Sequence, residues 1–155
     1  MKKSIDPRMH SVEHILNQTM DRMFHCGRCF NAHIERKKSK CDYRFNRPLS
    51  QMELQEIQTR VNRIFAEDLP VIEKYIPRSE ALRNYNTEKL PADAGDTIRI
   101  VQIGDYDACP CIGPHVKSSG EISGFQITSS SFDDGVLRIR FKLTPINDSV
   151  DLVAR

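Results

Sequence analysis

The chain has 155 residues, of which 39% are hydrophobic and 28% are charged, and its formal net charge is +2. This composition is typical of an ordinary soluble globular protein, and the length fits a single domain, 1–155, with a sizeable core. A membrane helix is excluded, because no run approaches the ~18 consecutive apolar residues that a span requires. The first seven residues lack the apolar segment of a signal peptide, so we expect a cytoplasmic protein.

The cysteines and the basic residues narrow the functional class. Five cysteines, an odd number, favour free thiols or metal ligands over a disulfide framework. The net charge is too small to indicate a nucleic-acid partner by itself, yet one segment is strongly basic. Its cations are Arg28, Arg36, Lys37, Lys38, Lys40, Arg44 and Arg47, opposed only by Glu35 and Asp42. Such a segment can contact phosphates without reading bases, and it is equally typical of a solvated hairpin.

The N-terminal segment is predicted to be a helix from Pro7 to about Phe24. Asp6 can cap it and Pro7 suits its first position. Apolar residues then recur at helical spacing, namely Val12, Ile15, Leu16, Met20 and Met23. His10 and His14 are four residues apart on this helix, so both imidazoles can reach one metal ion.

The next two elements are a predicted hairpin and a second helix. Alternation over residues 30–34 and 43–45, on either side of a Lys37-Lys38-Ser39 turn, indicates the hairpin, with Cys29, Asn31 and His33 on one face. Ser50 and Glu53 form a capping-box signature, and Pro70 marks the end of the helix that follows. Its apolar positions are Leu54, Ile57, Val61, Ile64 and Phe65.

The C-terminal half is predicted to contain mostly strands. We expect a short strand at 71–76, a short helix at 79–85, a polar loop at 86–95 and strands at 97–103, 122–128 and 136–143, with a turn at 133–135. Because helices and strands do not alternate regularly, the pattern favours an α+β fold, in which a mixed, mainly antiparallel sheet packs with two principal helices.

A second pair of metal-type ligands, Cys111 and His115, has the same four-residue spacing as His10 and His14. Gly113 and Pro114 lie between them and predict a tight loop. Three imidazole nitrogens and one thiolate suit tetrahedral Zn²⁺. A zinc site is therefore one interpretation; the other is that the histidines only form hydrogen bonds at the edge of the helix.

Two alternative sites are open at this point. Residues 10–14 have the H-x-x-E-H spelling of a metallopeptidase class, with Glu13 as general base. A second, structural zinc is the other alternative, with the knuckle-like set Cys26, Cys29, His33 and Cys41 as ligands.

The combination of His10-x-x-x-His14 and Cys111-Ile-Gly-Pro-His115 resembles the editing domain shared by alanyl- and threonyl-tRNA synthetases. The resemblance covers nearly the whole chain and includes the segments Cys41-Asp-Tyr-Arg-Phe45, Pro48-Leu-Ser, Val61-Asn62, Ile98-Arg-Ile-Val-Gln-Ile-Gly104 and Val116-Lys-Ser-Ser-Gly-Glu-Ile122. The length is similar to that of the short, free-standing AlaX-type members. The Gly113-Pro114-His115 spelling is threonyl-like, whereas the flanking sequence is alanyl-like.

The resemblance implies a zinc-dependent aminoacyl-tRNA deacylase that acts in trans on tRNA, and on neither DNA nor a membrane. The implied substrate is tRNA for alanine mischarged with serine or glycine, and the implied zinc ligands are His10, His14, Cys111 and His115. The alternative is a non-catalytic tRNA-binding relative that keeps the fold and the zinc. Cys109 is expected to line the site without binding the ion.

Further roles are assigned as expectations. Asn31 and His33 are candidates for contact with the substrate's amino acid, because a pocket that hydrogen-bonds a serine hydroxyl rejects alanine. The basic segment would contact the acceptor stem through Arg28, Arg36, Lys37, Lys38, Lys40 and Arg44. No catalytic general base is identified from the sequence.

Overall fold

The computed structural model describes residues 6–35, 38–87, 90–91 and 93–144. The first helix, α1 (Pro7–Phe24), begins and ends as predicted. Asp6 caps it by accepting a hydrogen bond from the backbone N–H of Arg8 at 2.9 Å. His25 ends it in the left-handed conformation, with φ 55°.

The second helix, α2 (Gln51–Glu67), confirms the predicted capping box. The side chains of Ser50 and Glu53 each accept a hydrogen bond from the other residue's backbone N–H. The helix ends where Asp68 adopts a left-handed conformation, just before Pro70.

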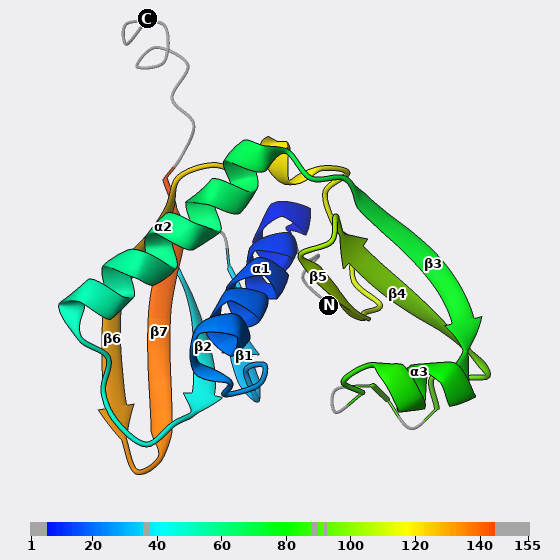
Figure 1. The fold of residues 1–155 in the computed structure, drawn as a ribbon, viewed down its shortest axis with the longest axis horizontal. Coiled ribbons are helices and arrows are strands. Elements are labelled where there is room, and N and C mark those ends of the chain that lie inside the picture. The colour runs from blue at the N-terminus through cyan, green and yellow to red at the C-terminus, as the bar shows by residue number, and fades with distance from the viewer. Residues whose placement is uncertain (1–5, 36–37, 88–89, 92, 145–155) are drawn as a thin grey trace, which may run out of the picture.

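The larger of two sheets is antiparallel and has the strand order β1-β2-β7-β6. Its strands are β1 (Asn31–His33), β2 (Ser39–Arg44), β7 (Val136–Leu143) and β6 (Phe125–Asp133). Both long helices cover one face of this sheet (Figure 1). The main core lies between them and includes Val12, Leu16, Tyr43, Ile57, Val61, Leu137, Ile139 and Phe141.

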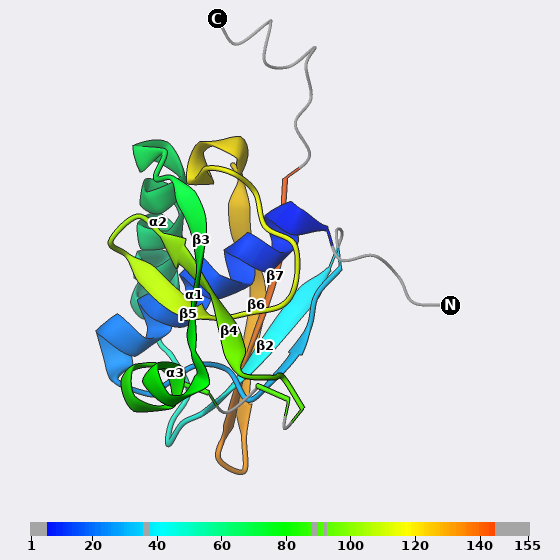
Figure 2. The same ribbon diagram turned by 90° about the vertical axis from the view of Figure 1, so that its right-hand side faces the viewer.

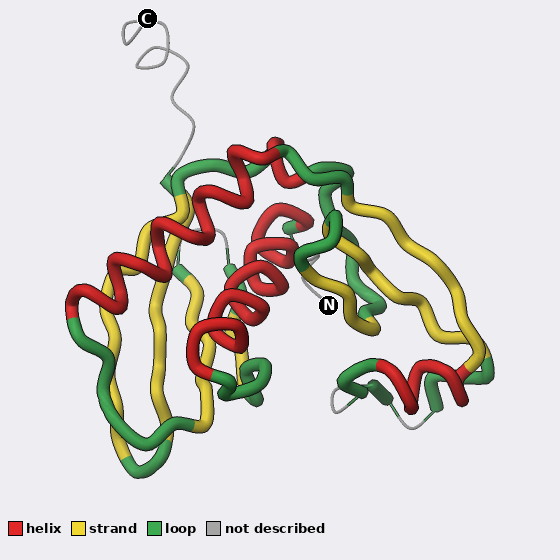
Figure 3. The backbone as a smooth tube through the Cα atoms, viewed as in Figure 1, coloured by secondary structure: helices red, strands yellow, loops and turns green. Residues whose placement is uncertain are grey.

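The smaller sheet has the order β3-β4-β5 and faces the viewer in Figure 2. It consists of β3 (Val71–Pro77), β4 (Thr97–Ile103) and β5 (Asp107–Pro110), and the short helix α3 (Arg78–Asn84) follows β3. A second small core joins this helix to the sheet through Ile76, Ala81, Ile98 and Ile100. A single 3-10 turn, η1 (Ser119–Glu121), precedes β6. Helix α1 lies between the two sheets and contacts β5 (Figures 1 and 3).

The α+β class is confirmed, and the structure corrects three details. The strands form two sheets, and every pairing among the described residues is antiparallel. Strand β5 was not predicted, although it carries the site loop. Strand β6 begins at Phe125 rather than Ile122 and continues to Asp133, with a register shift between Ile127 and Ser129. Within the described part of the chain, no helix is long and apolar enough to cross a membrane.

Candidate metal centre and adjoining cavity

One stripe of α1 supplies polar side chains to a cavity. His10, Glu13, His14 and Asn17 are spaced by three, one and three residues, so they project from the same side of the helix. All four line a cavity of about 250 Å³. The opposite side of α1 is buried in the main core. The sequence prediction that both histidines share one face is confirmed.

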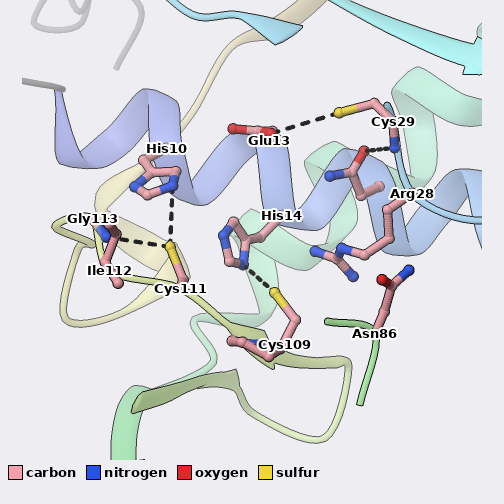
Figure 4. Close-up of a pocket in the computed structure, with 12 residues that line it drawn as sticks. His10, Glu13, His14, Arg28, Cys29, Asn86, Cys109, Cys111, Ile112 and Gly113 are labelled. Carbon is pink, nitrogen blue, oxygen red and sulfur yellow. Dashed lines mark hydrogen bonds between the residues drawn. The ribbon is translucent and has the colours of Figure 1, made fainter. Parts of the chain in front are cut away.

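The loop after β5 brings Cys111 to this helix (Figure 4), and His115 joins the same group of ligand atoms. The guanidinium of Arg99 on β4 donates to the carbonyl oxygens of Cys111 at 3.0 Å and Gly113 at 2.7 Å, which fixes the loop. A Cβ at Gly113 would lie well inside the van der Waals distance of the His10 ring. Only glycine therefore allows the loop to approach α1 so closely.

Two imidazoles are oriented by bonds to their Nδ1 atoms. Nδ1 of His10 lies 3.1 Å from the carbonyl oxygen of Pro114, and since a carbonyl only accepts, this nitrogen carries the hydrogen. Nδ1 of His115 lies 2.9 Å from the hydroxyl of Ser11. The Nε2 atoms of the two rings then approach the Cys111 sulfur at 3.2 Å and 3.4 Å. Both Nε2 atoms therefore face the same point.

The geometry of this group fits a zinc ion. One ligand atom from each residue lies within 4.8 Å of all the others, and the residues are His10, His14, Cys111 and His115. Zinc–nitrogen and zinc–sulfur bond lengths in a tetrahedron place neighbouring ligand atoms about 3.3–3.6 Å apart. The sulfur–nitrogen distances of 3.2 Å and 3.4 Å are close to this range. The donor set and these two distances thus suit Zn²⁺.

The electrostatics of the cluster favour the thiolate form of Cys111, which is the form that binds a metal. Burial alone would raise the pKa of the Cys111 thiol, but hydrogen bonds from the three imidazoles lower it to about 3. Burial also lowers the pKa of His115 to about 4, and the neighbouring charges of His14 and His10 act in the same direction. Burial would lower the pKa of His14, but its bonds to Asp107 and to the thiols of Cys109 and Cys111 outweigh burial and raise it. Because a metal binds deprotonated ligands, zinc would meet a thiolate at Cys111 and would displace a proton from His14.

A second group of potential ligands shares His14. Its Nδ1 lies 3.2 Å from the sulfur of Cys109 and 3.5 Å from a carboxylate oxygen of Asp107. Asp107 is fully buried and is held by Arg28 at 2.8 Å and 3.2 Å and by Gln18 at 2.8 Å. Burial opposes ionisation of Asp107, but its bonds to His14 and Arg28 outweigh that effect and hold its pKa below the ordinary range. Carboxylate–histidine pairs of this kind orient metal-binding imidazoles.

The cavity beside these groups has a closed end and an open mouth. Asn17 and Cys29 are only 3% and 2% exposed and form the inner wall. Ile112, 79% exposed, and Asn86 lie at the mouth. The volume is below the ~300–1,000 Å³ of sites for drug-sized ligands. The cavity can therefore enclose a small group and not a nucleotide.

The residues that were predicted to bind phosphates have different surroundings in the structure. Arg28 points into the cavity wall, where it pairs with Asp107. Lys40 pairs with Asp42 at 2.6 Å, whereas Lys38 and Arg44 are exposed, and Arg44 lies over the Phe30 ring. Two further members of the set lie outside the described residues, namely Arg36 and Lys37.

The predicted substrate contacts, Asn31 and His33, are exposed on β1 and do not line the cavity. Asn31 bonds Asp42 at 3.5 Å, and His33 pairs with Glu35. Their role in substrate binding stays a prediction. The expectation that Cys29 shares their face is wrong, because β1 begins only at Asn31, and the backbone N–H of Cys29 instead bonds Asn17 in the interior.

The alternative second zinc set is not brought together. Cys41 is buried in the main core and Cys26 donates to backbone carbonyls, while His33 is at the surface. Neither of the two ligand groups that converge among the described residues contains any member of this set. Glu13, the candidate base of the peptidase alternative, lies in the cavity wall, 3.6 Å from the Cys29 sulfur.

Sequence reasoning missed two residues of the site. Asn17 continues the stripe of His10 and His14 by one more turn, so the helical period could have identified it. Asp107 gave no signal, because a single acidic residue before an unpredicted strand is indistinguishable from a surface carboxylate.

Comparison with known proteins gives concordant matches. Residues 98–140, which include Cys111 and His115, match the family model described as the threonyl and alanyl tRNA synthetase second additional domain. The chain is 33% identical over 139 residues to the alanine–tRNA ligase of Methanopyrus kandleri and 35% identical over 141 residues to that of Cenarchaeum symbiosum. Each match covers 86% of this chain and 15% of the ligase. The chain thus spans a small part of the length of these relatives.

The four-ligand cluster, the α+β fold and these similarities agree with the resemblance noted in the sequence. The chain belongs to the editing-domain family of the alanyl- and threonyl-tRNA synthetases.

Proposed function

We propose that this protein hydrolyses the ester bond of mischarged tRNA in trans, and that its preferred substrate is tRNA for alanine carrying serine or, secondarily, glycine. The observation that carries the proposal is the convergence of His10, His14, Cys111 and His115 beside a cavity that admits only a small group. Relatedness to alanine–tRNA ligases supports tRNA as the partner. We propose the cytoplasm as the compartment in which it acts.

The residues present would hold Zn²⁺ with three imidazole nitrogens and one thiolate, and the ion would supply a Lewis acid close to the ester. An aminoacyl ester is intrinsically reactive, so the main task of the protein is to hold its carbonyl in a fixed place. The Arg99 bonds to the Cys111–Gly113 loop and the Asp107–Arg28 pair make the walls of the site rigid.

The wider contact with tRNA would be electrostatic. The acceptor end stays outside the cavity, because the cavity encloses only a small group. Exposed cations of the basic segment, such as Lys38 and Arg44, would approach its phosphates. Activity is then expected to fall as salt is added, since phosphate contacts release counterions.

The proposal is tested by deacylation of Ser-tRNA and Gly-tRNA for alanine, Ser-tRNA for threonine and correctly charged Ala-tRNA. Ser-tRNA for alanine should be hydrolysed fastest and Ala-tRNA should be spared. His10→Asn should reduce the rate by at least about 100-fold, because it removes a ligand. His25→Asn is the matched control, since His25 is an exposed residue at the left-handed end of α1, where asparagine is tolerated. Absence of turnover on every mischarged tRNA would instead support a non-catalytic tRNA-binding protein.

A further inference from the structure

Asn17 is nearly fully buried in the wall of the cavity, and the oxygen of its side-chain amide is hydrogen-bonded. Its Oδ1 accepts a hydrogen bond from the backbone N–H of Cys29 at 3.2 Å and another from the hydroxyl of Tyr43 at 2.8 Å. Because a backbone N–H can only donate, the oxygen must be the atom on that side, and the orientation of the amide is fixed. Tyr43 and Cys29 are themselves buried, so this arrangement is rigid.

The amide nitrogen of Asn17 is available as a hydrogen-bond donor. Among the described residues, Nδ2 of Asn17 donates a hydrogen bond to no protein atom, whereas Oδ1 receives two. Since Asn17 lines the cavity and its oxygen is engaged in the wall, the nitrogen is the polar atom left to face the cavity. In the described part of the chain, Nδ2 is not among the fully buried polar atoms that lack a partner, so it meets the open space of the cavity and can donate to an acceptor on a ligand.

Its position indicates which part of the substrate it meets. Asn17 lies one helical turn beyond His14, at the closed end of the cavity, and the exposed Ile112 lies at the mouth. The tRNA must remain at the mouth, and the ester lies at the end of the tRNA. The part of the aminoacyl group that reaches inward past the metal ligands is therefore its side chain.

We propose that Asn17 is a specificity-determining residue, whose Nδ2 donates a hydrogen bond to the side-chain hydroxyl of the bound amino acid. This inference rests on the proposed function, because it identifies serine as the group that the cavity recognises. An alanyl group offers no acceptor and leaves the donor unpaired, which is the physical basis for sparing correctly charged tRNA. A glycyl group has no side chain that could contact Asn17, so its hydrolysis should not depend on this residue.

The test uses two readouts on the zinc-loaded full chain. The first is binding of the stable seryl and alanyl amides of 3′-amino-3′-deoxyadenosine, measured by calorimetry. The wild type should bind the seryl amide about 10- to 100-fold more tightly, and Asn17→Ala should reduce the ratio to about one, because one hydrogen bond to a buried donor is lost. The second is hydrolysis, in which Asn17→Ala should slow release of serine by a similar factor and leave release of glycine unchanged.

Asn62→Ala is the matched control. Asn62 is also a helical asparagine, but its amide bonds the backbone of Gln58 and Phe125, away from the cavity. This variant should keep the seryl preference. If Asn17→Ala does not fold, Tyr43→Phe keeps the Asn17 side chain and removes one of its two orienting bonds, and it should reduce the preference by a smaller factor.

The outcomes separate this inference from the proposed function. A wild type that hydrolyses no mischarged tRNA but prefers the seryl amide, with the preference lost in Asn17→Ala, would refute the deacylase and support the role of Asn17. A seryl preference that survives Asn17→Ala would overturn that role, and, where that variant does not fold, so would a preference that Tyr43→Phe leaves at the wild-type value. Equal loss of serine and glycine release, or no seryl preference in the wild type, would also overturn it.

Discussion

Replacement of Gly113 by alanine tests the metal centre without changing any ligand. The added Cβ would collide with Cε1 and Nδ1 of the His10 ring and lie 3.3 Å from Nε2. The Gly113 carbonyl is held by Arg99 at 2.7 Å, so the loop cannot easily retreat. The His10 ring must therefore move, and its bond to the Pro114 carbonyl must break.

The expected losses of stability and of zinc affinity follow from this geometry. Because His10 is only half-buried, rotation of its ring relieves most of the clash, and the apo protein should lose about 1 kcal/mol, the lower end of the cost of overpacking. Zinc affinity should fall by at least about tenfold, since one of four ligands is displaced.

The assay is a zinc titration in competition with a chromophoric chelator, together with urea unfolding of the metal-free protein. Ile112→Ala is the control, because it changes the neighbouring residue, whose side chain is exposed. Wild-type zinc affinity in Gly113→Ala would show that His10 does not bind the ion in the arrangement described, and would refute the reasoning.

Three further predictions concern the ligands, their support and the fold. Cys111→Ser should lose zinc and Cys109→Ser should retain about one ion per chain by metal analysis; the reverse pattern would place the ion in the group of His14, Asp107 and Cys109. Asp107→Asn leaves Arg28 without its buried counterion, so unfolding in urea should show a loss of about 2–3 kcal/mol, and zinc affinity should fall about 10- to 100-fold; an unchanged zinc affinity would exclude the supporting role. Hydrogen bonds from Arg138, against the opposing effect of burial, lower the pKa of Asp42 to about 2. A depressed carboxyl pKa stabilises the fold above the unfolded value, so Asp42→Asn should cost about 1–2 kcal/mol at pH 7. This difference should shrink as the pH falls below about 4 and be mostly lost near pH 2, and a gap that keeps its full size at pH 2 would contradict it.

Local signals in the sequence predicted the helices and half of the site. Asp6, Pro7 and the apolar spacing set the limits of α1, so the shared face of His10 and His14 followed from the helical period alone. The capping box of α2 is equally local. These features depend on residues within a few positions of one another, which is why the sequence determines them.

The remainder depends on contacts between distant segments. Strand β5 has four residues, ends in Pro110, and exists because it pairs with β4, so periodicity could not reveal it. The proximity of Cys111 to α1 was one of two interpretations of the ligand spacing, and the family resemblance made it the expected one. Alternation placed Asn31 and His33 on one face, but it could not show that this face points away from the cavity.

The role of Arg28 shows the same limit. As a member of a basic segment it was expected to contact phosphates, yet its partner Asp107 is 79 residues away in the sequence. Its burial in the cavity wall could be predicted only with knowledge of how β5 packs on α1.

The most direct test of the central claim is the rate of deacylation of Ser-tRNA for alanine by protein stripped of metal, measured before and after stepwise addition of Zn²⁺. Activity should be absent from the stripped protein, rise in proportion to added zinc and reach its maximum at about one equivalent, and it should not return in the Cys111→Ser variant. Equal rates with and without zinc, or full activity in Cys111→Ser, would contradict a zinc-dependent editing site formed by His10, His14, Cys111 and His115.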